Sequence, residues 1–182
     1  MIPYPARVRR ATPDDIDALM LFVPQVLAET TLLPISPIKV ERLIERCATR
    51  QSGSIAGIID GADGIDAGIG MAFCESETSD VPFIRAVWCG LHPSVRKHPS
   101  SPDDPRAHYG RTLFEFARWC HEGLERAAGH PILLQFDLLT RTMLGAKMGL
   151  FQRNLQQVGA SFAFGAAGEF KNQPIRETAE VA

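Results

Sequence analysis

The chain has 182 residues, of which 45% are hydrophobic, so it is long enough for one domain with a substantial core and too short for two full ones. The formal net charge of −2 and the pI near 6.2 provide no general attraction for nucleic acid or for an anionic membrane, so neither is an expected partner. No apolar run approaches the roughly 18 residues of a membrane span, and residues 1–5 lack the apolar segment of a signal peptide. We therefore expect a cytoplasmic protein.

The four cysteines are far apart in the sequence. They are Cys47, Cys74, Cys89 and Cys120, with no Cys-x-x-Cys pair and no histidine at the spacing of a zinc site. We expect reduced, mostly buried thiols and no bound metal.

The first segment predicts a strand followed by a helix. Residues 7–11 are the strand candidate. Thr12 followed by Pro13 is typical of a helix start, because Thr12 can cap the helix and Pro13 suits its first position. Apolar residues at helical spacing continue to Leu27, although Pro24 should kink or shorten this helix.

A second helix and an antiparallel meander follow. Ser36-Pro37 repeats the cap-plus-proline pattern and opens a helix that we expect to run to about Arg50. Residues 54–60 and 65–75 are strand-like runs around a glycine turn, and 83–91 is a third strand. These three strands should pair in sequence order.

The second half of the chain alternates helices and strands. After a polar loop at 93–107, residues 109 to about 124 form an amphipathic helix. The apolar run 132–139 predicts a central strand covered on both faces and parallel to 83–91. A helix at 143–155 and a strand at 159–165 complete a single domain spanning 1–167.

Residues 168–182 carry alternating charges, and we expect a surface or mobile tail.

This order of elements resembles the general N-acetyltransferase (GNAT) superfamily, whose members transfer an acyl group from acetyl-CoA. Three segments carry the resemblance: Leu91-His92-Pro93-Ser94-Val95-Arg96 and Tyr109-Gly110-Arg111-Thr112-Leu113 are similar to the two halves of the family's pyrophosphate motif, and Ala146-Lys147-Met148-Gly149-Leu150-Phe151 followed by Gly159-Ala160-Ser161-Phe162 is similar to its fourth helix and last strand. The resemblance implies an α/β (α+β) fold, with a mixed, mostly antiparallel sheet flanked by helices on both faces.

The pyrophosphate motif departs from the family pattern. Roughly nine residues are inserted between Arg96 and Gly110, and His108 stands in the place of the first glycine. A side chain at 108 would crowd the approach of phosphate to the backbone. The insertion also brings Asp103 and Asp104, whose charges would repel a pyrophosphate that they faced.

The resemblance implies a cofactor site between the end of strand 83–91 and the start of helix 109–124. Its predicted residues are Cys89, Gly90, Leu91, Arg96, Lys97, His108, Tyr109, Gly110, Arg111 and Thr112. The pantetheine of CoA would lie along Cys89–Leu91, and the pyrophosphate would lie at 108–112, where a helix start presents backbone N–H groups. Arg96, Lys97, Arg106, His108 and Arg111 are the cations that would face the phosphates.

The resemblance also implies where catalytic side chains would lie. The tyrosine that often protonates the leaving thiolate in this family is replaced by Phe151, which has no proton to give. Glu75 and Asp137 are the candidate bases, and Asp137, inside an apolar run, either faces the cleft or is a hydrogen-bonded structural residue. We read Glu77 and Asp80 as part of a solvated turn, and Cys89 as a core thiol instead of a nucleophile.

Two functions remain open from the sequence. The first is an acyl-CoA-dependent N-acyltransferase that uses acetyl-CoA or a related acyl-CoA and acetylates an unidentified amine on a small molecule or a protein. The alternative is a catalytically degenerate GNAT-fold module that acts as a binding or structural subunit. A homodimer or a protein partner, and a docking or lid role for residues 98–105, stay open under both.

Overall fold

A computed structural model of the chain describes residues 7–30, 34–75, 83–96 and 104–136. The strands are β1 (Arg9–Arg10), β2 (Ile55–Gly61), β3 (Gly64–Cys74), β4 (Phe83–Leu91) and β5 (Leu133–Phe136). The α-helices are α1 (Ile16–Thr30), α2 (Pro37–Ala48), α3 (Pro93–Arg96) and α4 (Tyr109–Ala128), and short 3-10 turns form η1 (Pro13–Asp15), η2 (Gln51–Gly53) and η3 (Pro105–His108).

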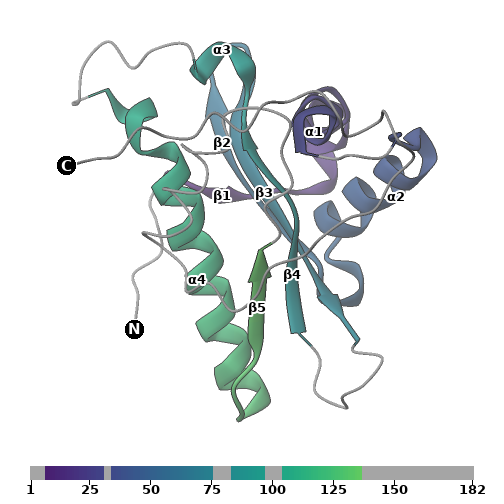
Figure 1. Ribbon diagram of the computed structural model, residues 1–182, viewed down its shortest axis with the longest axis vertical. Coiled ribbons are helices and arrows are strands. Elements are labelled where there is room, and N and C mark those ends of the chain that lie inside the picture. The colour runs from purple at the N-terminus through teal and green to yellow at the C-terminus, as the bar shows by residue number, and fades with distance from the viewer. Residues whose placement is uncertain (1–6, 31–33, 76–82, 97–103, 137–182) are drawn as a thin grey trace, which may run out of the picture.

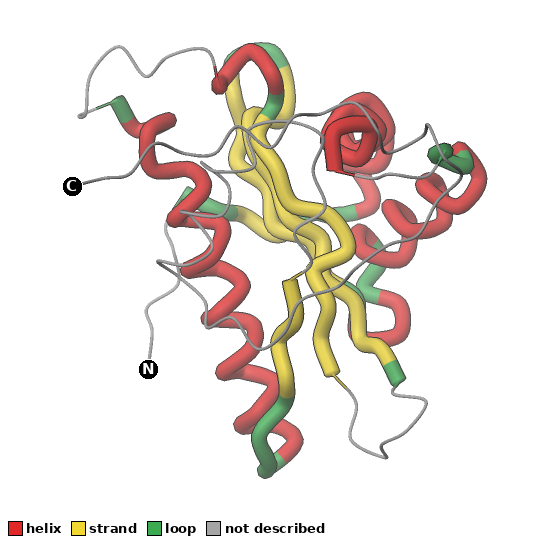
Figure 2. The backbone as a smooth tube through the Cα atoms, viewed as in Figure 1, coloured by secondary structure: helices red, strands yellow, loops and turns green. Residues whose placement is uncertain are grey.

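The five strands form one sheet in the order β1-β2-β3-β4-β5. The first three pairings are antiparallel and β4 pairs with β5 in parallel. Helix α4 covers one face, and α1 and α2 cover the other (Figures 1 and 2). The predicted mixed, mostly antiparallel sheet between helices is confirmed.

Apolar side chains form a layer on each face of the sheet. The α4 layer includes Ile69, Met71, Ile84, Leu113, Phe116 and Ile132. The α1/α2 layer includes Leu19, Phe22, Val26, Ile44, Ile58 and Trp88. Glycines in the sheet leave space for two large rings of these layers. Gly57 lies under the ring of Phe116, and Gly68 and Gly70 lie under the indole of Trp88.

Pro24 was predicted to kink or shorten the first helix; the shortening is wrong, because α1 continues through Pro24 to Thr30, and the kink stays a prediction. Interior proline costs about 3 kcal/mol through its lost N–H and the clash of its ring. The buried apolar face of α1, with Leu19, Val23 and Val26 at 1% exposure or less, offsets that cost.

The link from β1 to α1 depends on a buried carboxylate. Arg9 donates to both oxygens of Asp15 at 2.7 and 2.8 Å, and to both oxygens of Asp60 at 2.6 and 2.9 Å. The backbone N–H of Thr12 also donates to Asp15, at 2.8 Å. These contacts join the strand, the first turn of the helix and the end of β2.

We expect the stability of the fold to depend on Asp15 at acid pH. Hydrogen bonds from Arg9, supplemented by Thr12 and opposed by burial, lower the pKa of Asp15 from 3.8 to about 2. A lowered folded-state pKa stabilises the protein above pH 4 or so, and this contribution is lost as the pH falls through about 2. Because Arg9 is half exposed, we expect a loss of about 1–2 kcal/mol.

Urea unfolding at pH 4 and pH 2 checks this expectation. Asp15→Asn should be less stable than the wild type at pH 4 and should lose less stability on acidification, whereas Asp63→Asn, an exposed change in the β2–β3 turn, should follow the wild type. Equal losses in the wild type and Asp15→Asn would contradict the assignment.

Two expectations for the region after β4 need correction. The predicted loop at 93–107 contains the helical turns α3 and η3 at its ends, because Pro93 and Pro105 each follow a residue that caps a turn. The run at 132–139 is not covered on both faces at its start, since Leu133 is 54% exposed. Ile132, Leu134 and Phe136 pack on the α4 layer, so Leu133 faces the other side of the sheet, where it is not part of the α1/α2 layer.

Strand β5 is tied to α4 immediately before it begins. The backbone N–H of Ile132 donates to Glu125 Oε1 at 3.1 Å, and its carbonyl accepts from His121 Nε2 at 2.5 Å. The two side chains are one turn apart on α4 and fix where β5 starts beside β4.

The predicted helix at 143–155, the strand at 159–165 and the tail from 168 lie outside the described residues. In the described ranges, no helix combines the length and apolar character needed to cross a membrane.

Candidate functional site

Strand β4 contains a β-bulge at Val87. Trp88 pairs with Gly70 of β3, and the next pair is Ala86 with Met71, so Val87 is an extra residue in β4. Ala86 packs on the α4 layer, whereas both Val87 and Trp88 pack on the α1/α2 layer. A bulge of this kind bends a strand and takes one residue out of the hydrogen-bonded ladder.

Strand β5 pairs only with the part of β4 that precedes the bulge. It runs from Phe83 opposite Leu133 to Ala86 opposite Phe136, the last described residue of β5. Figure 1 shows β5 beside only one end of β4. Among the described residues, no strand pairs with Val87–Gly90 on the side away from β3.

The residues after the bulge are those predicted to carry pantetheine. Cys89 and Leu91 are partly buried and pack on the α4 layer. Gly90 lies against α1, because a Cβ there would be 2.7 Å from a methyl group of Val26. Burial raises the pKa of the Cys89 thiol to about 12, which is consistent with its interpretation as a core thiol.

The four cysteines are free thiols, with Cys47 and Cys120 buried and Cys74 and Cys89 partly buried.

The end of β4 is fixed to the start of α4 through Asp66 at the start of β3. The backbone N–H of His92 donates to the carbonyl of Asp66 at 2.7 Å, and the hydroxyl of Tyr109 lies 3.5 Å from Asp66 Oδ2. Tyr109 is 8% exposed and belongs to the α4 layer. Burial and the nearby Asp66 charge raise the pKa of the Tyr109 hydroxyl. Tyr109 therefore anchors the first turn of α4 with its ring directed into the core.

The turn before α4 is capped by the side chain of Asp104. Asp104 caps η3, the turn that leads directly into α4, and its Oδ1 accepts from the backbone N–H of Arg106 at 3.0 Å. The guanidinium of Arg106 donates to both Asp104 oxygens at 2.5 to 3.0 Å. The N–H of Ala107 donates to the Asp104 carbonyl at 2.9 Å, and that of Tyr109 donates to the Arg106 carbonyl. The N–H of Tyr109, one of the donors expected to be open at 108–112, is thus already bonded, as are those of Arg106 and Ala107 just before it.

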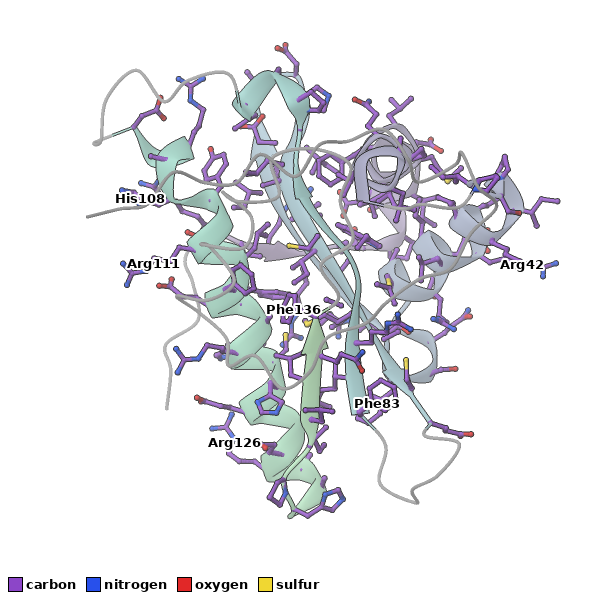
Figure 3. The ribbon with its side chains drawn as sticks, viewed as in Figure 1. Arg42, Phe83, His108, Arg111, Arg126 and Phe136 are labelled. Carbon is purple, nitrogen blue, oxygen red and sulfur yellow. The ribbon has the colours of Figure 1, made fainter. Side chains whose placement is uncertain are left out.

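The remaining predicted residues here are His108, at the end of η3, and Gly110, Arg111 and Thr112, in the first turn of α4. Figure 3 shows His108 and Arg111 on the side of α4 away from the sheet. Arg111 donates to Glu115 at 2.9 Å, and Thr112 Oγ1 donates to the His108 carbonyl at 3.0 Å. Gly110 is half-buried beside them.

Other predicted residues are only partly described. Arg96 is the last residue of α3, and neither its side chain nor Lys97 is among the described parts. Glu75 is exposed just after β3. Asp137 lies outside the described residues, as do Glu77, Asp80, Asp103 and Phe151. The assignments of these residues to catalysis or CoA binding stay predictions.

Sequence reasoning did not identify two features of this region. The capping role of Asp104 had a signal, because Asp104-Pro105 repeats the cap-plus-proline pattern of Thr12-Pro13. The Val87 bulge had none, since it exists only in the register with β3. In the described part of the chain, no group of three or more His, Cys, Asp or Glu side chains is arranged to hold a metal ion.

The chain was compared with known families, curated proteins and solved structures. No family model matches it, and no curated protein matches its sequence. Solved structures do match. A predicted acetyltransferase with acetyl-CoA from Clostridium acetobutylicum has a TM-score of 0.57 and 13% identity, covering 87% of this chain and 94% of that one. The chain has the GNAT acetyltransferase fold.

Two further GNAT-fold structures extend the comparison. Glucosamine-6-phosphate N-acetyltransferase from Arabidopsis thaliana has a TM-score of 0.56 and 9% identity, over 88% of this chain and 97% of that chain. Ribosomal-protein-alanine N-acetyltransferase from Brucella melitensis biovar Abortus 2308 has a TM-score of 0.52 and 8% identity, over 87% and 97%. The TM-scores and the coverage show a shared fold, and substrate and activity have to be argued from the site.

Proposed function

We propose that the chain is an acyl-CoA-dependent N-acyltransferase that transfers an acetyl group from acetyl-CoA to an amine. The observation that carries the proposal is the bulge at Val87, followed by the segment Trp88–Gly90 and then by the start of α4. An extended segment whose outer side faces no described strand can pair with the amide groups of a pantetheine arm, as an added strand pairs with a sheet edge.

The reaction needs little from side chains. The amine nitrogen attacks the thioester carbonyl carbon, the C–S bond breaks, and the CoA thiolate leaves while the nitrogen loses a proton. Holding the amine beside the carbonyl supplies much of the rate enhancement, and backbone donors released from the ladder at a bulge are suited to polarising the carbonyl oxygen. Glu75 and Asp137 remain the proposed bases.

The second candidate is a GNAT-fold module that has lost transfer. The contact that favours it is the Asp104–Arg106 ion pair, which occupies the turn where phosphate would bind. Under this proposal the chain would act as a binding or structural subunit, alone, as a homodimer or with a protein partner.

Calorimetry with acetyl-CoA and desulfo-CoA, followed by a thiol-release assay with a panel of amines, tests both. We expect acetyl-CoA to bind with a dissociation constant between about 1 µM and 1 mM, and at least one amine to release CoA thiol above the rate of hydrolysis. Absence of binding at millimolar ligand would reject the enzyme. Binding without amine-dependent release would favour the second candidate.

A further inference from the structure

We propose that Asp104 is an internal competitor for the phosphate groups of a CoA ligand, so that the ligand binds only when the Asp104–Arg106 ion pair opens. This inference rests on the proposed function, and it adds a built-in autoinhibitory contact to the cofactor site.

The contact has the features of an occupied anion site. The Asp104 side chain is 10% exposed, whereas that of Arg106 is 42% exposed. One carboxylate oxygen of Asp104 accepts from the backbone N–H of Arg106 and from its Nε, and the other accepts from Nε and Nη2. Backbone and guanidinium donors that suit a phosphate oxygen thus converge on an internal carboxylate.

The surroundings of Arg106 strengthen the competition. The hydrogen bonds and the charge of Asp104, with a smaller contribution from the charge of Asp66, raise the pKa of the Arg106 guanidinium. Tyr109 holds the turn in place through its buried ring. An arriving pyrophosphate would therefore have to displace the Asp104 carboxylate to reach the backbone N–H and the guanidinium of Arg106.

Opening the contact would exchange one anion for another on the same donors. The phosphate carries more charge and more oxygens than one carboxylate, so it can take over the Arg106 guanidinium and the freed backbone N–H. No covalent bond changes. The inserted residues between α3 and α4 therefore reduce CoA affinity through Asp104.

Calorimetry of the full chain with acetyl-CoA tests the inference. Asp104→Asn keeps a side chain able to cap the turn but removes the charge, and we expect it to bind acetyl-CoA about fivefold tighter than the wild type. Asp17→Asn makes the same change on α1, on the other face of the sheet, and should bind as the wild type does. Adding Arg106→Gln to Asp104→Asn should abolish the gain. Circular dichroism and melting temperature establish that each variant is folded.

The outcomes separate this inference from the proposed function. Tighter binding by Asp104→Asn, or binding by this variant alone, supports the inference. Equal affinities of the wild type and Asp104→Asn overturn it and leave the proposed enzyme standing. A gain that persists without Arg106 also overturns it. If neither protein binds acetyl-CoA at millimolar concentration, the proposed function fails and this inference fails with it.

Discussion

Gly57→Ala is expected to lower the free energy of unfolding by about 2–3 kcal/mol, although it adds a single methyl group. A Cβ at this position would lie 2.4, 2.7 and 2.8 Å from three carbons of the Phe116 ring. Phe116 is fully buried and stacks on Trp119 with ring centroids 6.4 Å apart, so the ring has little room to move. Helix α4 would have to shift away from β2. Chemical denaturation measures the loss.

Two further variants make this prediction specific to the contact. Gly123→Ala lies in α4, where the nearest atom to the added methyl is 3.9 Å away, and it should raise stability by about 0.5–1 kcal/mol because alanine favours the helix. Combining Gly57→Ala with Phe116→Leu should cost less than the sum of the single changes, since the smaller side chain relieves the clash. Additive costs would mean that the two residues are not in tight contact.

Deletion of Val87 is expected to weaken acetyl-CoA binding at least tenfold while the chain remains folded. Ala86 and Trp88 already face opposite layers of the core, so removing Val87 restores regular alternation without turning any other side chain over. The cost should be limited to about 1–2 kcal/mol for one partly buried side chain. The bend that interrupts β4 beside β5 would be lost, and with it the proposed pantetheine path.

Val87→Ala is the matched control for the deletion. It removes most of the side chain but keeps the extra backbone residue, and it should bind acetyl-CoA within about twofold of the wild type. Calorimetry gives both affinities, and circular dichroism reports folding. A deletion variant that binds as well as the wild type would show that the bulge does not shape the site.

The sequence predicts the bounds of an element correctly where capping, proline or glycine residues within a few positions decide them. The predicted strand 83–91 has the bounds of β4, and the turn η1 and the helix α2 begin at Pro13 and Pro37, where the cap-plus-proline pattern places a helical start. The turn between Gly61 and Gly64 is also as expected, with Gly64 at a φ of 136°. Such features depend on residues within one turn of one another.

Predictions failed where distant residues decide the outcome. The packing of α1 against the sheet stabilises the helix on both sides of Pro24. Sequence rules that consider only neighbouring residues do not include this packing. The exposure of Leu133 depends on how far the α1/α2 layer extends over the sheet, because Leu134 and Phe136 face α4 and Leu133 faces the other side. In both cases, apolar contact between separate elements outweighs the preference of a single residue.

By itself, the sequence determined the order of elements, the resemblance to the GNAT superfamily and the interrupted phosphate motif between Arg96 and Gly110. Hydrophobic spacing and proline, glycine and capping residues determine these properties, and each of these signals acts over a few positions. Only the tertiary structure revealed the bulge at Val87 and the ion pair that Asp104 forms with Arg106 at the start of α4. The bulge depends on the register between β3 and β4. The ion pair depends on the conformation of the turn before α4, which brings the Asp104 and Arg106 side chains together. Residue order alone gives neither geometry.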